Sequence, residues 1–158
     1  MQAEFKMSMI GELTHFLRLQ IRQQDSGIFL SQSKYAKNLM KKFGLESASS
    51  VRTLMSPNVK LTMELLGKSV DPSLYRSMIG SLLYLTASRP DISYSVGVCV
   101  RYQANPKESH MIALKRIIKY VKTTVEFGVW VGNADDKKSN SGGCFYVGNN
   151  LVSWMGKE

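Results

Sequence analysis

The spacing of apolar residues divides the chain into strand-like ends and a helical middle. Near the start, Leu17, Leu19 and Ile21 alternate with mostly polar neighbours, which is typical of a strand with one buried face. The turn signal Asp25-Ser26-Gly27 separates this strand from a second apolar run. Residues 14–31 are therefore predicted to form a β-hairpin.

A helix is predicted directly after the hairpin. Tyr35, Leu39 and Phe43 recur at a spacing of four residues, and Gly44 is a suitable C-terminal stop. Residues 46–70 are small and polar, with little helical or strand pattern. They are predicted to be either a linker or an ordered irregular crossing, and their low hydrophobicity favours mobility.

Residues 71–124 are predicted to form three helices joined by short connections, which favours antiparallel packing. Asp71 before Pro72 is a typical N-cap. Ser88 and Asn105 each precede a carboxylate by three residues, which resembles a capping box. Gly97 is expected to let a neighbouring helix approach closely. The predicted core positions are Leu74, Tyr75, Met78, Ile79, Leu82, Leu85, Ile92, Val96, Cys99, Val100, Met111, Leu114, Ile118 and Val121.

After Thr124 the apolar pattern returns to a period of two. Strands are predicted at 125–131, 144–147 and 151–154, with a hairpin turn at 148–150. Such a small sheet is marginal alone, so residues 125–158 are interpreted as the opening of a domain whose remainder is missing. The predicted fold class is α+β, with an N-terminal β-hairpin, a helical bundle and C-terminal strands.

The composition narrows the function classes. The chain has 158 residues, of which 44% are hydrophobic, and a net charge of +9, which favours nucleic acid or another polyanion as partner. A basic protein without such a partner is the alternative. No apolar run is long enough to span a membrane and the start lacks a signal-peptide pattern, so an intracellular, cytoplasmic or nuclear protein is expected. Cys99 and Cys144 are interpreted as buried, reduced thiols.

Lysine and arginine residues gather on two predicted helices. They form either solvated faces or contacts to nucleic-acid phosphates. The candidate binding residues are Lys34, Lys37, Lys41, Lys42, Lys115, Arg116, Lys119 and Lys122.

Metal and catalytic sites are not predicted. Asp135 and Asp136 are adjacent, so on a strand they would point to opposite faces. His15 and His110 are isolated from any nucleophile pattern and are interpreted as packing or surface residues. No catalytic residue, metal or cofactor is therefore expected.

Five blocks of the chain carry a more specific signal. They are EFKMSMIGELTHFLRLQI, GIFLSQSKYAKNLMKKFGL, YRSMIGSLLYLTASRPDISYSVGVCVRYQANPKESH, ALKRIIKYVK and KSNSGGCFYVGNNLVSW. Together and in this order they resemble the pol polyprotein of copia-type LTR retrotransposons, as found in plants. The resemblance extends over nearly the whole chain.

The resemblance implies a place within that polyprotein. Residues 1–31 would contain the hairpin that follows the reverse transcriptase palm and grips the primer strand. Residues 32–124 would be a thumb-like and connection-like region with a linker at 46–70. Residues 125–158 would be a truncated, RNase H-like β segment.

Departures from the family pattern imply a chain without catalysis. The palm and its metal-binding aspartates would lie before Met1, and polymerisation needs such an aspartate pair. Residues 129–138 join segments that normally flank an RNase H strand carrying an aspartate ligand, and that aspartate is absent. Arg18 and Thr123 stand where the family usually has glycine.

Three hypotheses follow. The first is a non-catalytic retrotransposon remnant that binds RNA or DNA duplexes, without regard to sequence, through its basic faces. The second is a co-opted host or selfish-element protein, such as a regulator, immunity factor or toxin-like protein, that binds a protein partner at a former interdomain surface. The third is a pseudogene product with no function. No membrane partner is expected.

Overall fold

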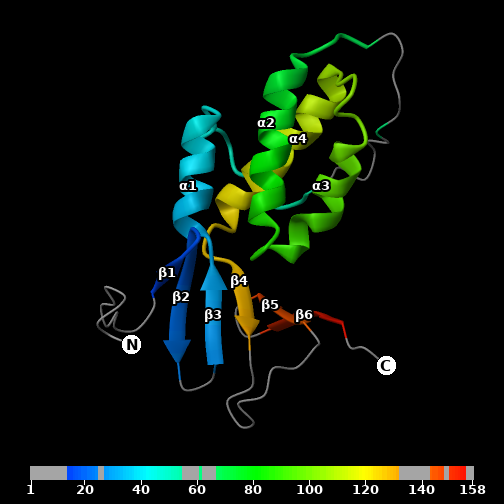
Figure 1. Cartoon of the computed structure of the whole chain (residues 1–158). Helices are drawn as coiled ribbons and strands as arrows, with labels where there is room; N and C mark the ends of the chain where they lie inside the picture. The colour runs from blue at the N-terminus through cyan, green and yellow to red at the C-terminus, as the bar shows by residue number, and fades with distance from the viewer. Residues whose placement is uncertain are drawn as a thin grey trace, which may run out of the picture.

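The helices lie at one end of a small antiparallel sheet in the computed structural model, which describes residues 14–24, 27–54, 61, 67–131 and the backbone of 143–147 and 150–155 (Figure 1). The α+β fold class is confirmed. The elements are β1 (His15–Phe16), β2 (Leu19–Gln24), β3 (Gly27–Ser31), α1 (Ser33–Lys42), α2 (Pro72–Leu85), the 3₁₀ turn η1 (Pro90–Ile92), α3 (Ser93–Val100), α4 (Glu108–Thr123), β4 (Gly128–Val131), β5 (Gly143–Val147) and β6 (Asn150–Met155).

The first predicted strand is interrupted by a tight turn. Phe16 pairs with Leu19, so Leu17 and Arg18 form a two-residue loop between β1 and β2. Their φ angles are 45° and 64°, in the left-handed region that side chains other than glycine rarely adopt. The prediction of one continuous strand is therefore wrong here. The glycine that the family resemblance leads one to expect at position 18 was the available signal, because glycine suits this conformation.

The hairpin strands and β4 form one sheet in the order β1-β2-β3-β4. β2 and β3 pair as predicted, and Leu30 of β3 pairs antiparallel with Val129 of β4. Gly128 permits this pairing, since a Cβ there would lie 2.2 Å from the Leu30 carbonyl oxygen. Segments assigned above to the two ends of the chain thus share hydrogen bonds. The boundaries at 31/32 and 124/125 stay a prediction, as does the RNase H likeness of the end.

A second sheet follows in the sequence. β5 and β6 pair antiparallel, with Val147 opposite Asn150. The strands predicted at 144–147 and 151–154 are therefore confirmed. The side chain of Cys144 lies outside the described part of the chain.

The helices surround one apolar core, and the chain reverses direction between successive helices of α2, α3 and α4 (Figure 1). Most predicted core positions are buried. The prediction is wrong for Leu74, which is 44% exposed on the outer face of α2. Val100 is only half-buried. The buried apolar residues are Ala36, Leu39, Met40, Tyr75, Met78, Ile79, Leu82, Leu85, Ile92, Val96, Cys99, Met111, Leu114, Ile117, Ile118 and Val121.

Cys99 is confirmed as a buried free thiol. The hydroxyl of Tyr75 donates to the Cys99 carbonyl at 2.8 Å, which links α2 to α3 inside the core. Burial raises the pKa of the Cys99 thiol to about 11 and moves the pKa of the Tyr75 hydroxyl above its ordinary value. Both groups therefore stay neutral in the folded core.

The predicted helix boundaries are partly correct. Asp71 caps α2, and its Oδ1 accepts a hydrogen bond from the Ser73 backbone N–H at 2.8 Å. Gly44, with φ of 64°, follows the end of α1 as predicted. Gly97 is not a close-contact position, because it is exposed and a Cβ there would meet no atom within 4 Å.

The two predicted capping boxes do not form. Ser88 instead donates to Gln32 Oε1 at 2.8 Å in the interior. The N-cap of α4 is Lys107, not Asn105, and its backbone N–H donates to His110 Nδ1 at 3.0 Å. His110 is buried, as one of the two interpretations above had it, and stacks on Tyr102 at a centroid distance of 4.0 Å. The Ser88 side chain therefore has a tertiary partner in place of its predicted local one.

None of the helices in the described part of the chain combines the length and apolar character needed to cross a bilayer.

Candidate nucleic-acid interface

Two of the candidate cations on α4 are engaged inside the chain. Lys122 Nζ donates to the carbonyl oxygens of Glu46 and Ala48 at 2.6 and 2.8 Å. Arg116 donates to the carbonyl and hydroxyl oxygens of Thr53 at 3.1 and 2.6 Å. Both side chains therefore hold the segment that follows α1 against α4.

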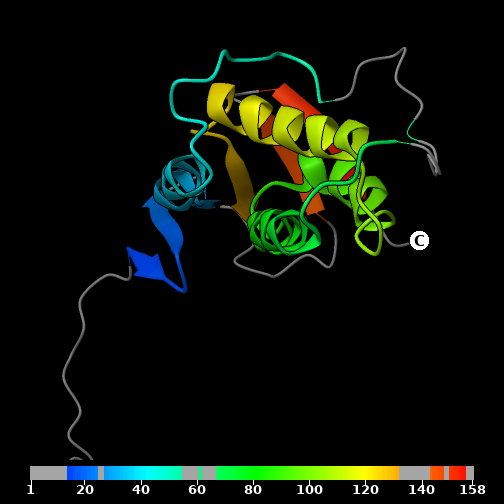
Figure 2. The ribbon, with the colours of Figure 1, turned by 90° about the horizontal axis from the view of Figure 1, so that it is seen from above.

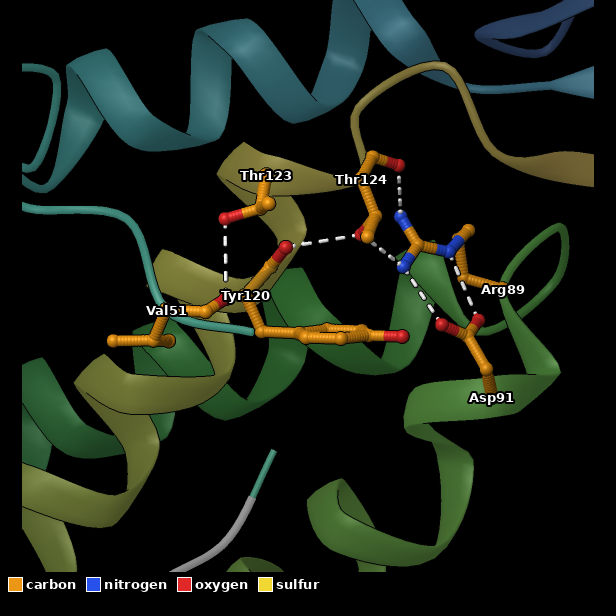
Figure 3. Close-up of polar contacts among 6 residues, drawn as sticks. All are labelled: Val51, Arg89, Asp91, Tyr120, Thr123 and Thr124. Atoms are coloured by element: carbon orange, nitrogen blue, oxygen red, sulfur yellow. Dashed lines mark hydrogen bonds and ion pairs between the residues drawn. The ribbon is translucent and has the colours of Figure 1, made fainter. Parts of the chain in front are cut away.

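The segment 46–53 runs along α4, as the cyan trace in Figure 2 shows. A third contact lies between the other two, where Thr123 Oγ1 donates to the Val51 carbonyl at 3.1 Å (Figure 3). Residues 46–53 therefore form an ordered irregular crossing, which is one of the two structures that the sequence predicts for residues 46–70. The threonine that replaces a common family glycine at 123 thus makes a contact that glycine has no atom to make.

A buried arginine joins the start of α3 to the end of α4 (Figure 3). Arg89 is 2% exposed, and its Nε and Nη2 donate to the Asp91 carboxylate at 2.9 and 2.7 Å. Nη1 and Nη2 also donate to the carbonyl and hydroxyl oxygens of Thr124 at 2.8 and 2.6 Å. The cation thus neutralises a carboxylate and sits at the negative end of the α4 dipole. The cluster is structural, and sequence reasoning mistook its Ser-Arg-Pro-Asp segment for a helix cap.

The remaining candidate cations include two that line a cleft of about 480 Å³ between the Leu17–Arg18 turn, α1 and α2. Lys34 and Lys42 of α1 lie in its wall together with Arg18 of the turn. None of the described residues that line it is acidic, so the cleft is a region of positive potential. The lining residues are His15, Arg18, Gln20, Lys34, Tyr35, Asn38, Leu39, Lys42 and Ser81.

The turn is held over α1 and α2 by Arg18 itself. Its guanidinium lies 5.5 Å from the ring centroid of Tyr35 and 5.9 Å from that of Tyr84. The Tyr84 hydroxyl also donates to the Leu17 carbonyl. Each left-handed residue in the turn costs on the order of 1–3 kcal/mol, and these contacts offset part of that cost. Sequence reasoning identified Arg18 only as a departure from glycine and missed its place in the cleft.

The wall of the cleft is fixed by contacts between elements. Gln20 Oε1 of β2 accepts the Lys34 backbone N–H at 3.0 Å, which joins the sheet to the first turn of α1. Lys42 Nζ donates to Ser77 Oγ of α2 at 3.2 Å and lies 5.0 Å from the Phe43 ring. The charged groups of Arg18 and Lys42 are thus held by contacts to other residues, whereas the contact of Lys34 is made by its backbone.

The other four candidates do not line the cleft. Lys37 forms an ion pair with Glu126 at 3.7 Å, and both side chains are 63% exposed. Within the part of the chain that the structure describes, the side chains of Lys41, Lys115 and Lys119 make no hydrogen bond or ion pair. The fold therefore divides the eight candidates among a cleft, a crossing-segment anchor and solvated faces.

No group of three or more histidine, cysteine, aspartate or glutamate side chains is placed to hold a metal ion within the described ranges. Asp135 and Asp136 lie outside those ranges. His15 is at the surface, as one of its two interpretations had it, and also lines the cleft.

Comparison with known proteins places the chain among transposon sequences. It is 32% identical over 175 aligned residues to the uncharacterized mitochondrial protein AtMg00810 of Arabidopsis thaliana, covering 100% of this chain and 72% of that protein. It is 34% and 32% identical, over 164 residues each, to the retrovirus-related Pol polyproteins from transposons RE1 and RE2 of the same plant. Those alignments cover 93% of this chain and 11% of each polyprotein.

No family model matches the chain, and no solved structure matches it. The alignments with these three relatives nevertheless extend over most of the chain, and two of the relatives are Pol polyproteins from transposons. The chain therefore belongs to the family of copia-type retrotransposon Pol polyproteins and their short mitochondrial relative.

Proposed function

We propose that this retrotransposon-derived chain binds nucleic acid through the phosphate backbone at the basic cleft. The observation that supports the proposal is the convergence of Arg18, Lys34 and Lys42 on one cleft whose described lining residues include no carboxylate. Clustered cations attract nucleic acid by counterion release and contact phosphates without reading bases. Arg18 is the strongest of the three contacts, because its planar guanidinium donates to two phosphate oxygens at once.

Binding is measured by fluorescence anisotropy with labelled oligonucleotides at salt concentrations from about 50 to about 200 mM. Three phosphate contacts give a slope of log K against log salt of about −2 to −3. Arg18→Gln, Lys34→Gln and Lys42→Gln are each expected to reduce the magnitude of that slope by about 1.

The matched controls are Lys115→Gln and Lys119→Gln, which remove cations of α4 that do not line the cleft. They are expected to weaken binding less than the cleft variants do. A flat salt dependence, or no binding at about 50 mM salt, refutes the proposal. Equal losses in the α4 controls would instead assign binding to dispersed charge.

We further propose that the chain acts by contact and not by catalysis. Support comes from residues 129–138, where the aspartate that the family resemblance leads one to expect is absent. The purified chain is incubated with Mg²⁺ or Mn²⁺ and either a primer–template or an RNA–DNA hybrid. Nucleotide incorporation or hybrid cleavage that is lost on Asp135→Asn would refute this part of the proposal.

A second candidate function is binding of a protein partner at the aliphatic face of the first sheet. Ile28 and Val131 are paired across β3 and β4 and are 40% and 46% exposed, and the pair Leu30 and Val129 follows on the same face. Exposed apolar patches of this kind favour protein association. A stoichiometric partner that copurifies from native tissue and is lost in Ile28→Lys, but retained in Tyr94→Lys, supports it. A wild-type chain that purifies from native tissue as a monodisperse monomer without a partner counts against it.

A further inference from the structure

Aromatic rings gather beside the basic cleft, which a site built only for phosphates does not require. Tyr35 lines the cleft. The Tyr84 ring lies edge-on to the Tyr35 ring, with the two ring centroids 5.0 Å apart and the ring planes at 65°. Tyr84 is not itself a lining residue, but its ring contacts the lining residues Tyr35 and Arg18 and is 40% exposed. Ring surface at the edge of the cleft is therefore available to a ligand.

The two tyrosine rings are fixed in place before any ligand arrives. The Tyr35 hydroxyl donates to the Ser81 carbonyl at 3.1 Å, and the Tyr84 hydroxyl donates to the Leu17 carbonyl. The guanidinium of Arg18 lies over both rings. Side chains that are already ordered lose little entropy on binding, so this arrangement is suited to hold a flat group.

Unpaired bases are the flat groups that a nucleic acid can present. In a duplex each base is covered by its neighbours in the stack, whereas in a single strand its face is free for aromatic side chains. The cleft volume of about 480 Å³ lies within the range of sites for small ligands, roughly 300–1,000 Å³. Such a cleft accepts individual nucleotide units of a strand, and the side of a duplex is too broad to enter it.

We infer that the cleft binds single-stranded nucleic acid in preference to duplex, with a base stacked on Tyr84 and phosphates held by Arg18, Lys34 and Lys42. This inference rests on the proposed function and specifies its substrate. Base stacking on an aromatic ring supports binding without sequence preference. It therefore agrees with a site that contacts phosphates and reads no base edges.

The test compares the full chain binding to a labelled thymidine strand of about 20 nucleotides and to a blunt duplex of the same length, a length that exceeds common site sizes. The expected result is binding of the single strand about tenfold or more tighter. Tyr84→Leu weakens single-strand binding about fivefold or more and leaves duplex binding unchanged.

Two control variants separate stacking from structural effects. Tyr84→Phe removes the hydroxyl contact to Leu17 but keeps the ring, and it retains most of the single-strand affinity. Tyr94→Leu removes a 78% exposed ring on α3, a helix that supplies no residue to the cleft lining, and it changes nothing. A loss in Tyr84→Phe as large as in Tyr84→Leu would overturn the assignment of stacking to this ring.

The outcomes distinguish this inference from the proposed function on which it depends. If neither nucleic acid binds, the proposed function fails and the inference fails with it. If the duplex binds as tightly as the single strand or more tightly, the proposed function stands and the inference is overturned.

Discussion

Replacing Arg89 with methionine is expected to destabilise the fold more than any surface charge substitution. The side chain is 2% exposed and donates hydrogen bonds to Asp91 and to both oxygens of Thr124. Methionine occupies much of the volume of the arginine stem, so the change removes the charge and its hydrogen bonds while leaving little cavity. What remains is a carboxylate without its cation and the end of α4 without its donor.

The expected loss in the free energy of unfolding is about 3 kcal/mol. Breaking a buried ion pair by removing one partner costs about 3–5 kcal/mol. The lower end applies because the Asp91 side chain is 22% exposed and regains some hydration. At about 2–4 °C per kcal/mol for a chain of this size, the melting temperature falls by about 6–12 °C.

Urea denaturation followed by circular dichroism measures this loss, with the midpoint expected to fall and the slope m to stay unchanged. Lys37→Met is the matched control, because it also removes the cation of an ion pair, but one whose side chains are both 63% exposed. That variant should lose less than about 1 kcal/mol. If Arg89→Met destabilises no more than Lys37→Met, the cluster does not stabilise the junction of α3 and α4 as argued.

Three further predictions concern packing, the crossing segment and the buried thiol. Gly128→Ala should lower the free energy of unfolding by about 1–3 kcal/mol, because its Cβ would collide with the Leu30 carbonyl. Gly97→Ala should raise the free energy of unfolding by about 0.5–1 kcal/mol. Changes of the same sign for both variants in urea denaturation would contradict this prediction. Lys122→Met should lower the free energy of unfolding by about 1 kcal/mol and accelerate amide hydrogen exchange across residues 46–53. The control Lys115→Met should change the free energy of unfolding by less than about 0.5 kcal/mol and leave amide exchange unchanged. Stability should fall as the pH rises above 9, since the Cys99 thiol ionises in the unfolded chain at its ordinary pKa of 9.0 but only at about 11 when folded. Cys99→Ala should remove part of that slope in urea titrations above and below pH 9, and an unchanged slope would show that the thiol is not its source.

The sequence alone determined those features that depend on neighbours along the chain. The helices of residues 71–124 and their buried stripes follow from a local period of 3.6 residues, and the Asp71 cap follows from adjacent residues. The family was also recognisable, because ordered blocks of residues are a property of sequence. The abundance of cations was visible in the same way, although their arrangement was not.

Only the tertiary structure decided which cations lie together. Lys122 and Arg116 share the basic stripe of α4 with Lys115 and Lys119, yet the crossing segment engages them through contacts 63 to 76 residues apart in the chain. The Leu17–Arg18 turn likewise depends on tyrosines supplied by α1 and α2. Periodicity reports which face a residue lies on but not what lies opposite that face. The basic cleft therefore exists only where the folded chain brings its turn and two helices together.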